Sequence, residues 1–146
     1  MATLLLAEFR LIGAGKAFLH LAIGAALLGL APNFRHVGSP AGLLLLVFGL
    51  TSHAGRSEAR GLRHLTATTF TPPALRRAAL VVAGTAWTIL LAVPAAIATV
   101  SIDPLLLGAA TGAAAAMTAV ILSMISGSGF AARLVLLMAW YAYISP

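Results

Sequence analysis

The side chains that could carry out catalysis are few and widely separated in this sequence. The three carboxylates, Glu8, Glu58 and Asp103, lie in three different segments, so no pair is placed for general acid–base chemistry. The four histidines form no i, i+4 pair, and the absence of cysteine removes thiolate nucleophiles and cysteine-based metal sites. The stretch SGSGF at 126–130 lacks the lysine of a phosphate-binding loop, so the chain cannot hydrolyse ATP alone. We therefore predict no enzymatic activity, no metal and no cofactor of its own.

His20 is the histidine with an alternative role as a ligand. It lies among small residues in KAFLHLAIGAALLG, four positions after Lys16. A histidine inside a membrane helix is a functional candidate, here as a ligand to haem iron or to the magnesium of a pigment. The other interpretation is a neutral histidine near the membrane edge, bonded to water or to a helix carbonyl. The short distance from Lys16 favours the second interpretation, so haem or pigment ligation is not expected.

The composition indicates which elements must position these residues. Of the 146 residues, 61% are hydrophobic and 8% are charged, whereas soluble domains carry about a quarter charged residues. Apolar runs such as AGLLLLVFGL show no period-two alternation, which excludes a membrane β-barrel. Helices are the other structure that satisfies its backbone groups in lipid. The sequence therefore predicts an all-α, polytopic membrane protein.

Five transmembrane helices are expected in this single membrane domain, each judged against the roughly 20 apolar residues that cross a bilayer. Before them, an apolar stripe that includes Leu4, Leu5 and Phe9 predicts an interfacial helix over 1–16. A frayed start to the first span is the alternative. The expected spans are 17–31, 40–53, 78–100, 104–125 and 131–146, with a cytoplasmic loop over 54–77.

The basic residues predict the orientation. With the N-terminus in the cytoplasm, Arg35 is the one residue among nine lysines and arginines that falls outside. The net charge of +6 then reflects membrane orientation, so nucleic acid is not an expected partner. We predict a multi-pass protein of the inner (plasma) membrane.

The loop HAGRSEARGLRHLTATTFTPPALRR carries most of these charges. Arg56, Arg60 and Arg63 recur at helical spacing, which predicts a short amphipathic helix on the cytoplasmic face. A solvated basic loop on anionic headgroups is the alternative. Thr71, followed by two prolines, predicts a second helix start that leads into the span at 78–100.

Small residues recur at the spacing of close helix contacts. Gly108 and Gly112 are four positions apart, and Gly24, Ala25 and Gly29 provide a similar surface in the first span. Such patterns let membrane helices approach closely. We expect these faces to pack against helices of this chain or of a partner.

The whole chain resembles the membrane subunit of ABC-2-type transporters. In that family an interfacial elbow helix precedes span one, and a cytoplasmic segment after span two couples to the ATPase. Within this sequence Glu58, Gly61 and Leu65 match the acid, glycine and leucine of the segment, and Thr68 and Thr71 match its later hydroxyl residues. The ending ILSMISGSGFAARLVLLMAWYAYIS is similar to the turn between spans four and five and to the Trp-Tyr close of the family.

The resemblance implies a permease component of an exporter, which uses ATP only through a cytoplasmic ATPase partner. The sequence departs from the family at Leu62, His64 and Thr69, and a sixth span is missing. A non-catalytic accessory subunit of a respiratory or photosynthetic complex is therefore the alternative. Membrane lipid and other membrane subunits are expected partners in both cases. The expected partner-coupling residues are Arg56, Glu58, Arg60, Gly61, Arg63 and Leu65.

Overall fold

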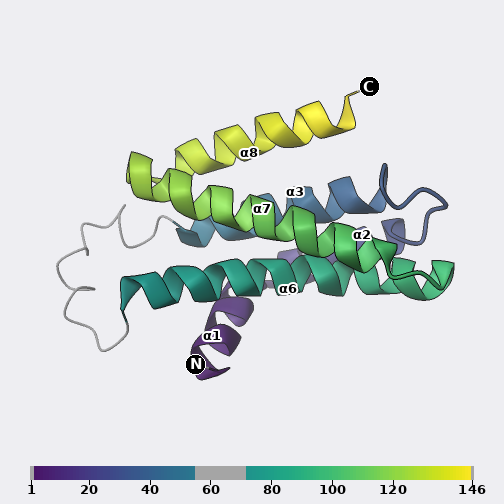
Figure 1. Ribbon diagram of the computed structural model, residues 1–146, viewed down its shortest axis with the longest axis horizontal. Coiled ribbons are helices and arrows are strands. Elements are labelled where there is room, and N and C mark those ends of the chain that lie inside the picture. Colours follow the sequence, from purple (N-terminus) through teal and green to yellow (C-terminus); the bar gives the residue numbers. More distant parts are fainter. Residues whose placement is uncertain (1, 55–71, 146) are drawn as a thin grey trace.

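The computed structural model describes residues 2–54 and 72–145, and these residues form helices and no strand (Figure 1). This confirms the predicted all-α class. The six helices of the described ranges are α1 (Ala2–Ile12), α2 (Lys16–Leu28), α3 (Gly38–Ala54), α6 (Pro73–Thr99), α7 (Asp103–Ser126) and α8 (Gly129–Ile144).

Helices α6 and α7 are each long and apolar enough to cross a membrane. They contain 27 and 24 residues, which correspond to about 40 and 36 Å at 1.5 Å per residue, against a hydrocarbon core of roughly 30 Å. They correspond to the expected spans 78–100 and 104–125. Figure 1 shows them side by side and antiparallel, and they make the most extensive helix pair of the fold.

The other three expected spans are shorter helices. α2 has 13 residues, α3 has 17 and α8 has 16. Only when α1 and α2 are taken together, with a bend of 87° between them, does this part of the chain reach the length and apolarity of a span. The described residues thus contain two helices that could cross alone, or three with the bent pair, and five complete spans are not confirmed.

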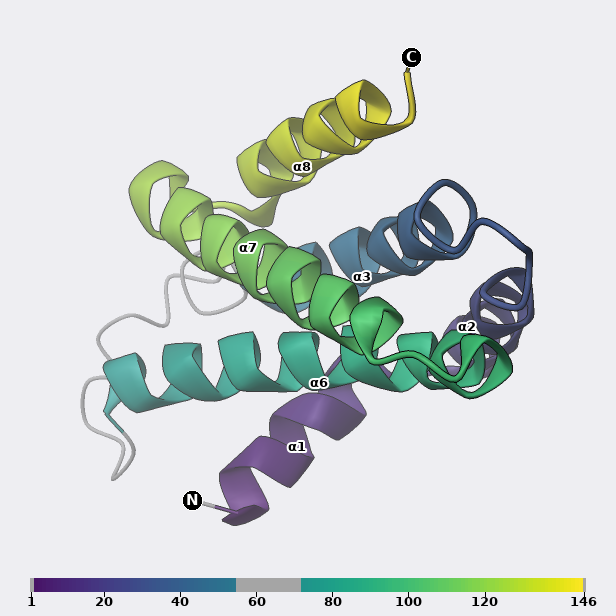
Figure 2. The ribbon, with the colours of Figure 1, turned by 45° about the vertical axis from the view of Figure 1, so that its right-hand side comes forward.

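The bend between α1 and α2 follows from the glycines at 13 and 15. Gly15 adopts φ 113°, a conformation that L side chains rarely adopt. A Cβ atom on Gly13 would collide with the indole ring of Trp87, so only glycine lets the chain pass this close to α6. The helix expected over 1–16 therefore ends at Ile12, and the chain turns before α2. Figure 2 shows α1 projecting from the side of α6.

Small residues hold α6 and α7 close together. A Cβ atom on Gly108 would lie 3.0 Å from the Thr88 carbonyl oxygen and 3.2 Å from the Ala92 Cβ. A Cβ atom on Gly112 would overlap the Thr88 hydroxyl. Both glycines are buried. The close helix contact that the sequence predicts at Gly108 and Gly112 is confirmed, whereas Gly24 has no atom within 4 Å of its added Cβ.

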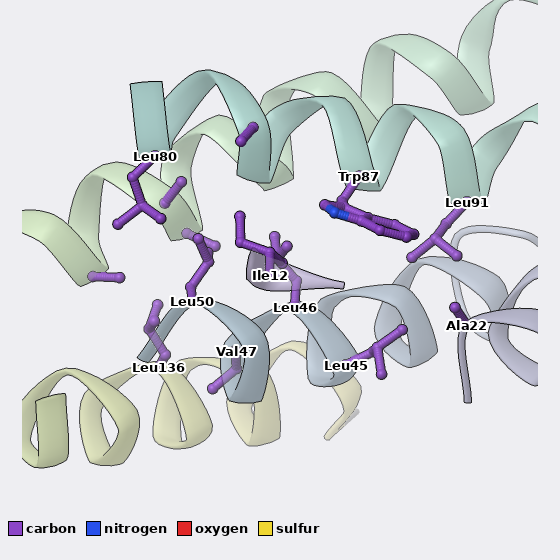
Figure 3. Close-up of a cluster of buried hydrophobic side chains, with 14 of the residues drawn as sticks. Ile12, Ala22, Leu45, Leu46, Val47, Leu50, Leu80, Trp87, Leu91 and Leu136 are labelled. Atoms are coloured by element: carbon purple, nitrogen blue, oxygen red, sulfur yellow. The ribbon is translucent and has the colours of Figure 1, made fainter. Parts of the chain in front are cut away.

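The buried core lies between α3 and α6. Figure 3 shows Leu80, Trp87 and Leu91 projecting from α6 toward the side chains of α3. Leu46 and Leu50 of α3 are almost fully buried there, at 1% and 0% exposure. This arrangement makes α3 the central helix, with α6 on one side and α8 on the other.

Two aromatic side chains of α8 hydrogen-bond to the first turn of α3 and to the loop before it. The Trp140 indole Nε1 donates a hydrogen bond to the Pro40 carbonyl oxygen at 2.8 Å, and the Tyr143 hydroxyl donates to the Arg35 carbonyl oxygen at 3.0 Å. Helix α8 begins at Gly129, two residues earlier than the expected span, after a turn in which Gly127 has φ 66°.

The Trp140 bond leads to a stability prediction. Trp140→Phe keeps an aromatic ring but leaves the Pro40 carbonyl without this donor, which costs about 1 kcal/mol. The measurement is the unfolding midpoint in a mild detergent under increasing denaturant. Tyr141→Phe on the same helix is the matched control, because Tyr141 is 66% exposed. Equal midpoints for the two variants would contradict the role given to Trp140.

Candidate functional site

The predicted partner-coupling residues lie outside the described ranges. The structure therefore places only the helix ends on either side of that segment. Helix α6 begins at Pro73, and Pro72 is the residue before it. The predicted helix start near Thr71 continues without a break into the span, and Thr71 itself is outside the described residues. The predicted residues that receive no placement are Arg56, Glu58, Arg60, Gly61, Arg63 and Leu65.

The ends that flank this segment lie together. The end of α3, the start of α6 and the start of α8 are at the same side of the molecule in Figure 1. Arg76 and Arg77 lie in the first two turns of α6, and Arg133 lies in the first two turns of α8. We call these three arginines, with the last turn of α3, the basic end.

Arg133 connects α8 to α3 at the basic end. Its Nε donates to the Thr51 hydroxyl oxygen at 3.1 Å, and its Nη2 lies 3.4 Å from the Ser52 hydroxyl oxygen. Both hydroxyls donate in turn to carbonyl oxygens of α3 at 2.7 Å. The guanidinium carbon lies 5.5 Å from the ring centre of Phe48, in cation–π geometry. Among the described residues, the two hydroxyls and the Phe48 ring are the partners of the Arg133 guanidinium, and none of them is a carboxylate.

A groove opens beside this arginine. It has a volume of about 620 Å³ and lies between the α1–α2 bend and one face of α3. Most of its lining is apolar, and Ser52 and His53 form its polar end. Four lining residues are exposed, so the groove is open along one side. The lining residues are Ile12, Ala14, Phe18, Leu21, Ala41, Leu44, Leu45, Phe48, Gly49, Ser52 and His53.

Trp87 of α6 packs against the α1–α2 bend, which forms one wall of the groove. Its indole stacks on Phe9 with ring centres 4.5 Å apart and planes 5° apart, and it meets Phe18 edge-on at 5.1 Å. The indole Nε1 also donates to the Phe9 carbonyl oxygen at 3.0 Å. One side chain of α6 therefore contacts both α1 and α2, which fixes the direction of α1.

Glu8 is the buried carboxyl of α1, at 7% exposure. Burial raises the pKa of the Glu8 carboxyl above its usual value, and the positive charge of Arg76 opposes that rise. Glu8 is not part of the apolar stripe predicted for this helix, yet the structure buries its side chain. The influence of Arg76 on Glu8 could not be read from the α1 sequence, because Arg76 is 68 positions away.

His20 lies on an exposed face of α2. Its Nδ1 is 2.7 Å from the Lys16 carbonyl oxygen. A carbonyl oxygen only accepts, so the Nδ1 atom of His20 carries a proton and donates this hydrogen bond. This hydrogen bond is the one that the non-ligand interpretation of His20 expects.

A second, much smaller cavity lies between α3, α6 and α7. Its volume is about 10 Å³, which is room for about one water molecule. The buried Ser39 hydroxyl lines it and has no hydrogen-bond partner among the described residues, and Thr88 and Thr111 complete its polar lining. This cavity could not be predicted from the sequence, because each of these residues alone is ordinary in a membrane helix.

The described residues contain no group of three or more His, Asp or Glu side chains that could hold a metal ion. The groups in this site that could bind a ligand are thus an apolar groove, a cluster of hydroxyls and the positive charge of Arg133. No protein-family model, curated protein or solved structure matches this chain.

Proposed function

We propose that this chain is the membrane permease component of an ABC-type exporter, working with a separate cytoplasmic ATPase. In this proposal the chain crosses the inner membrane several times with its N-terminus in the cytoplasm. The sequence resemblance to ABC-2-type permeases is the starting point. The supporting structural feature is the 87° bend between α1 and α2, because a helix set at an angle before the first span is what the resemblance implies.

The bend supports the proposal because it is an ordered feature of the fold. The glycines at 13 and 15 permit it, and Trp87 contacts both of its sides. A frayed first span would not need a buried indole or a backbone hydrogen bond to hold it. Helix α1 has 11 residues, which is too short to cross a bilayer by itself.

The proposed coupling uses the ends of α3 and α6. Residues 55–72 join these helices, so a partner docked on 55–70 would displace the end of α3 and the start of α6 together. Both helices contribute to the same core, and α6 also contacts the α1–α2 bend through Trp87. Docking on this segment would therefore move the helices beside the groove. Alternating access with a second permease copy is the proposed use of that movement.

Co-purification tests the proposal. The tagged chain, expressed in its native host and extracted gently, is expected to retain an ATPase subunit. Charge reversal at Glu58→Lys should weaken that association by more than about tenfold, since like charges facing each other at an interface cost several kcal/mol. Asp103→Lys, at the α6–α7 turn, is the matched control and should leave it unchanged. Retention of redox or pigment proteins with no ATPase would overturn the proposal.

The alternative is a non-catalytic accessory subunit of a respiratory or photosynthetic complex. The observation that favours it is the apolar outer face of α2, where large side chains are exposed and only Ala22 and Ala25 are buried in that helix. His20 is also exposed on this helix. In that case co-purification would recover subunits of the larger complex. The exposed apolar side chains of α2 are Leu19, Leu21, Ile23, Leu27 and Leu28.

A further inference from the structure

We propose that the groove beside α3 binds the acyl chain of an anionic phospholipid, whose phosphate is held at the basic end by Arg133 and Ser52. The proposal rests on the shape of the groove, its length and the charge at one of its ends. It does not depend on transport or on an ATPase, so it stands or fails separately from the proposed function.

The lining of the groove suits a hydrocarbon chain. Phe18, Leu44 and Leu45 provide apolar walls, and the volume of about 620 Å³ lies within the 300–1,000 Å³ that ligand pockets occupy. The exposed side chains of Leu21 and Phe48 form its open edge. A chain lying in the bilayer can therefore enter from the side without passing through the protein.

The length of the groove matches one leaflet. Its lining along α3 runs from Ala41 to His53, which is about 18 Å at 1.5 Å per residue. Half of a hydrocarbon core of roughly 30 Å is about 15 Å. The apolar part of the groove therefore holds one acyl chain from the leaflet on the side of the basic end.

The charge at the polar end selects the headgroup. Arg133 reaches the rim at Ser52 and stacks over Phe48, both of which line the groove. Its partners within the described ranges are hydroxyl oxygens, so its positive charge is hydrogen-bonded but not neutralised by them. A guanidinium pairs well with a phosphate, because it presents its N–H groups as a fork. The groove should therefore bind an anionic headgroup, whose phosphate has no compensating cation, in preference to a zwitterionic headgroup.

The test is native mass spectrometry of the full chain in a mild detergent, with added phosphatidylglycerol or phosphatidylcholine of identical acyl chains. We expect one bound lipid per chain and about a fivefold preference for phosphatidylglycerol, as one basic residue near a membrane surface contributes. Arg133→Gln should reduce that preference to less than about twofold, and Arg133→Lys, which keeps the charge but not the fork, should give an intermediate preference. Arg35→Gln, at the opposite end of the bundle, should leave it unchanged.

A second pair of variants tests the acyl-chain part without altering Arg133. Leu21 and Leu27 are both on α2 and both 62% exposed, but only Leu21 lines the groove. Leu21→Trp should lower the binding of both lipids by about fivefold or more relative to Leu27→Trp. Equal binding of the two lipids by the unaltered chain, or equal lipid binding by the two tryptophan variants, would overturn the proposal. So would full displacement of the lipid by inorganic phosphate, which would indicate a site for the free anion.

Discussion

Trp87→Ala is expected to be the most destabilising single substitution in the described part of the chain. It removes the indole that stacks on Phe9, meets Phe18 and donates to the Phe9 carbonyl oxygen. Large aromatic-to-alanine changes in a core cost about 3–5 kcal/mol. The loss should appear as a lower unfolding midpoint in mild detergent. Because the indole contacts both α1 and α2, the same change should also release α1 from α6.

The release of α1 can be measured separately. The chain has no cysteine, so two spin labels introduced at Thr3→Cys and Val82→Cys report the α1–α6 distance alone. A single narrow distance is expected for the parent chain and a broad distribution for Trp87→Ala. Trp87→Phe keeps most of the ring area and should lose about 1 kcal/mol, the contribution of one hydrogen bond. An unchanged narrow distance in Trp87→Ala would show that other contacts hold the bend.

Gly112→Leu is expected to separate α6 from α7. A Cβ at this position already overlaps the Thr88 hydroxyl, and Thr88 is itself buried at 5% exposure. Thr88 donates to the Thr85 carbonyl oxygen at 2.8 Å, so it is held in place and cannot easily move aside. Overpacking of this kind costs about 1–3 kcal/mol and occasionally more. The effect should increase from Gly112→Ala to Gly112→Leu.

Gly24 provides the matched control for this series. It lies inside α2, and an added Cβ would have no atom within 4 Å. Gly24→Ala should therefore be neutral or stabilising by up to about 1 kcal/mol, the helix-propensity gain over glycine. Unfolding midpoints of the alanine and leucine variants at both positions give the comparison. If Gly112→Leu and Gly24→Leu lowered the midpoint equally, the close seam between α6 and α7 would be refuted.

The sequence predicted the two long helices well, for a simple physical reason. The runs that become α6 and α7 are continuous and apolar, and Pro73 and Gly127 mark a start and an end. The seam at Gly108 and Gly112 was also predicted, because small-residue spacing is a local signal. These features need no knowledge of distant residues.

The shorter elements were harder to predict. The end of α1 depends on Gly13 passing against Trp87, which lies 74 positions later in the sequence. The expected span 17–31 corresponds to a helix that ends at Leu28, and α8 begins before the expected 131. Long-range contacts such as Trp140 with Pro40 determine where these helices sit, and periodicity carries no signal for them.

The candidate site was predicted only in part. The basic residues identified one side of the protein, but their spacing gave no indication that Arg133 would reach Thr51 and Ser52, 82 and 81 positions away. The groove arises from the bend between α1 and α2, whose angle depends on tertiary packing. The glycines at 13 and 15 were the available signal. They indicate that a helix ends there but do not indicate the direction in which the chain turns.

Measuring the orientation in the membrane tests most directly the central proposal, that the chain crosses the membrane several times with its basic end in the cytoplasm. Single cysteines at Asn33→Cys, Ser57→Cys, Ser101→Cys and Ser128→Cys are labelled in intact cells with a membrane-impermeant maleimide. The account predicts labelling at 33 and 101, and protection at 57 and 128 until the cells are opened. Labelling of 57 in intact cells, or labelling of all four positions in a soluble fraction, would contradict it.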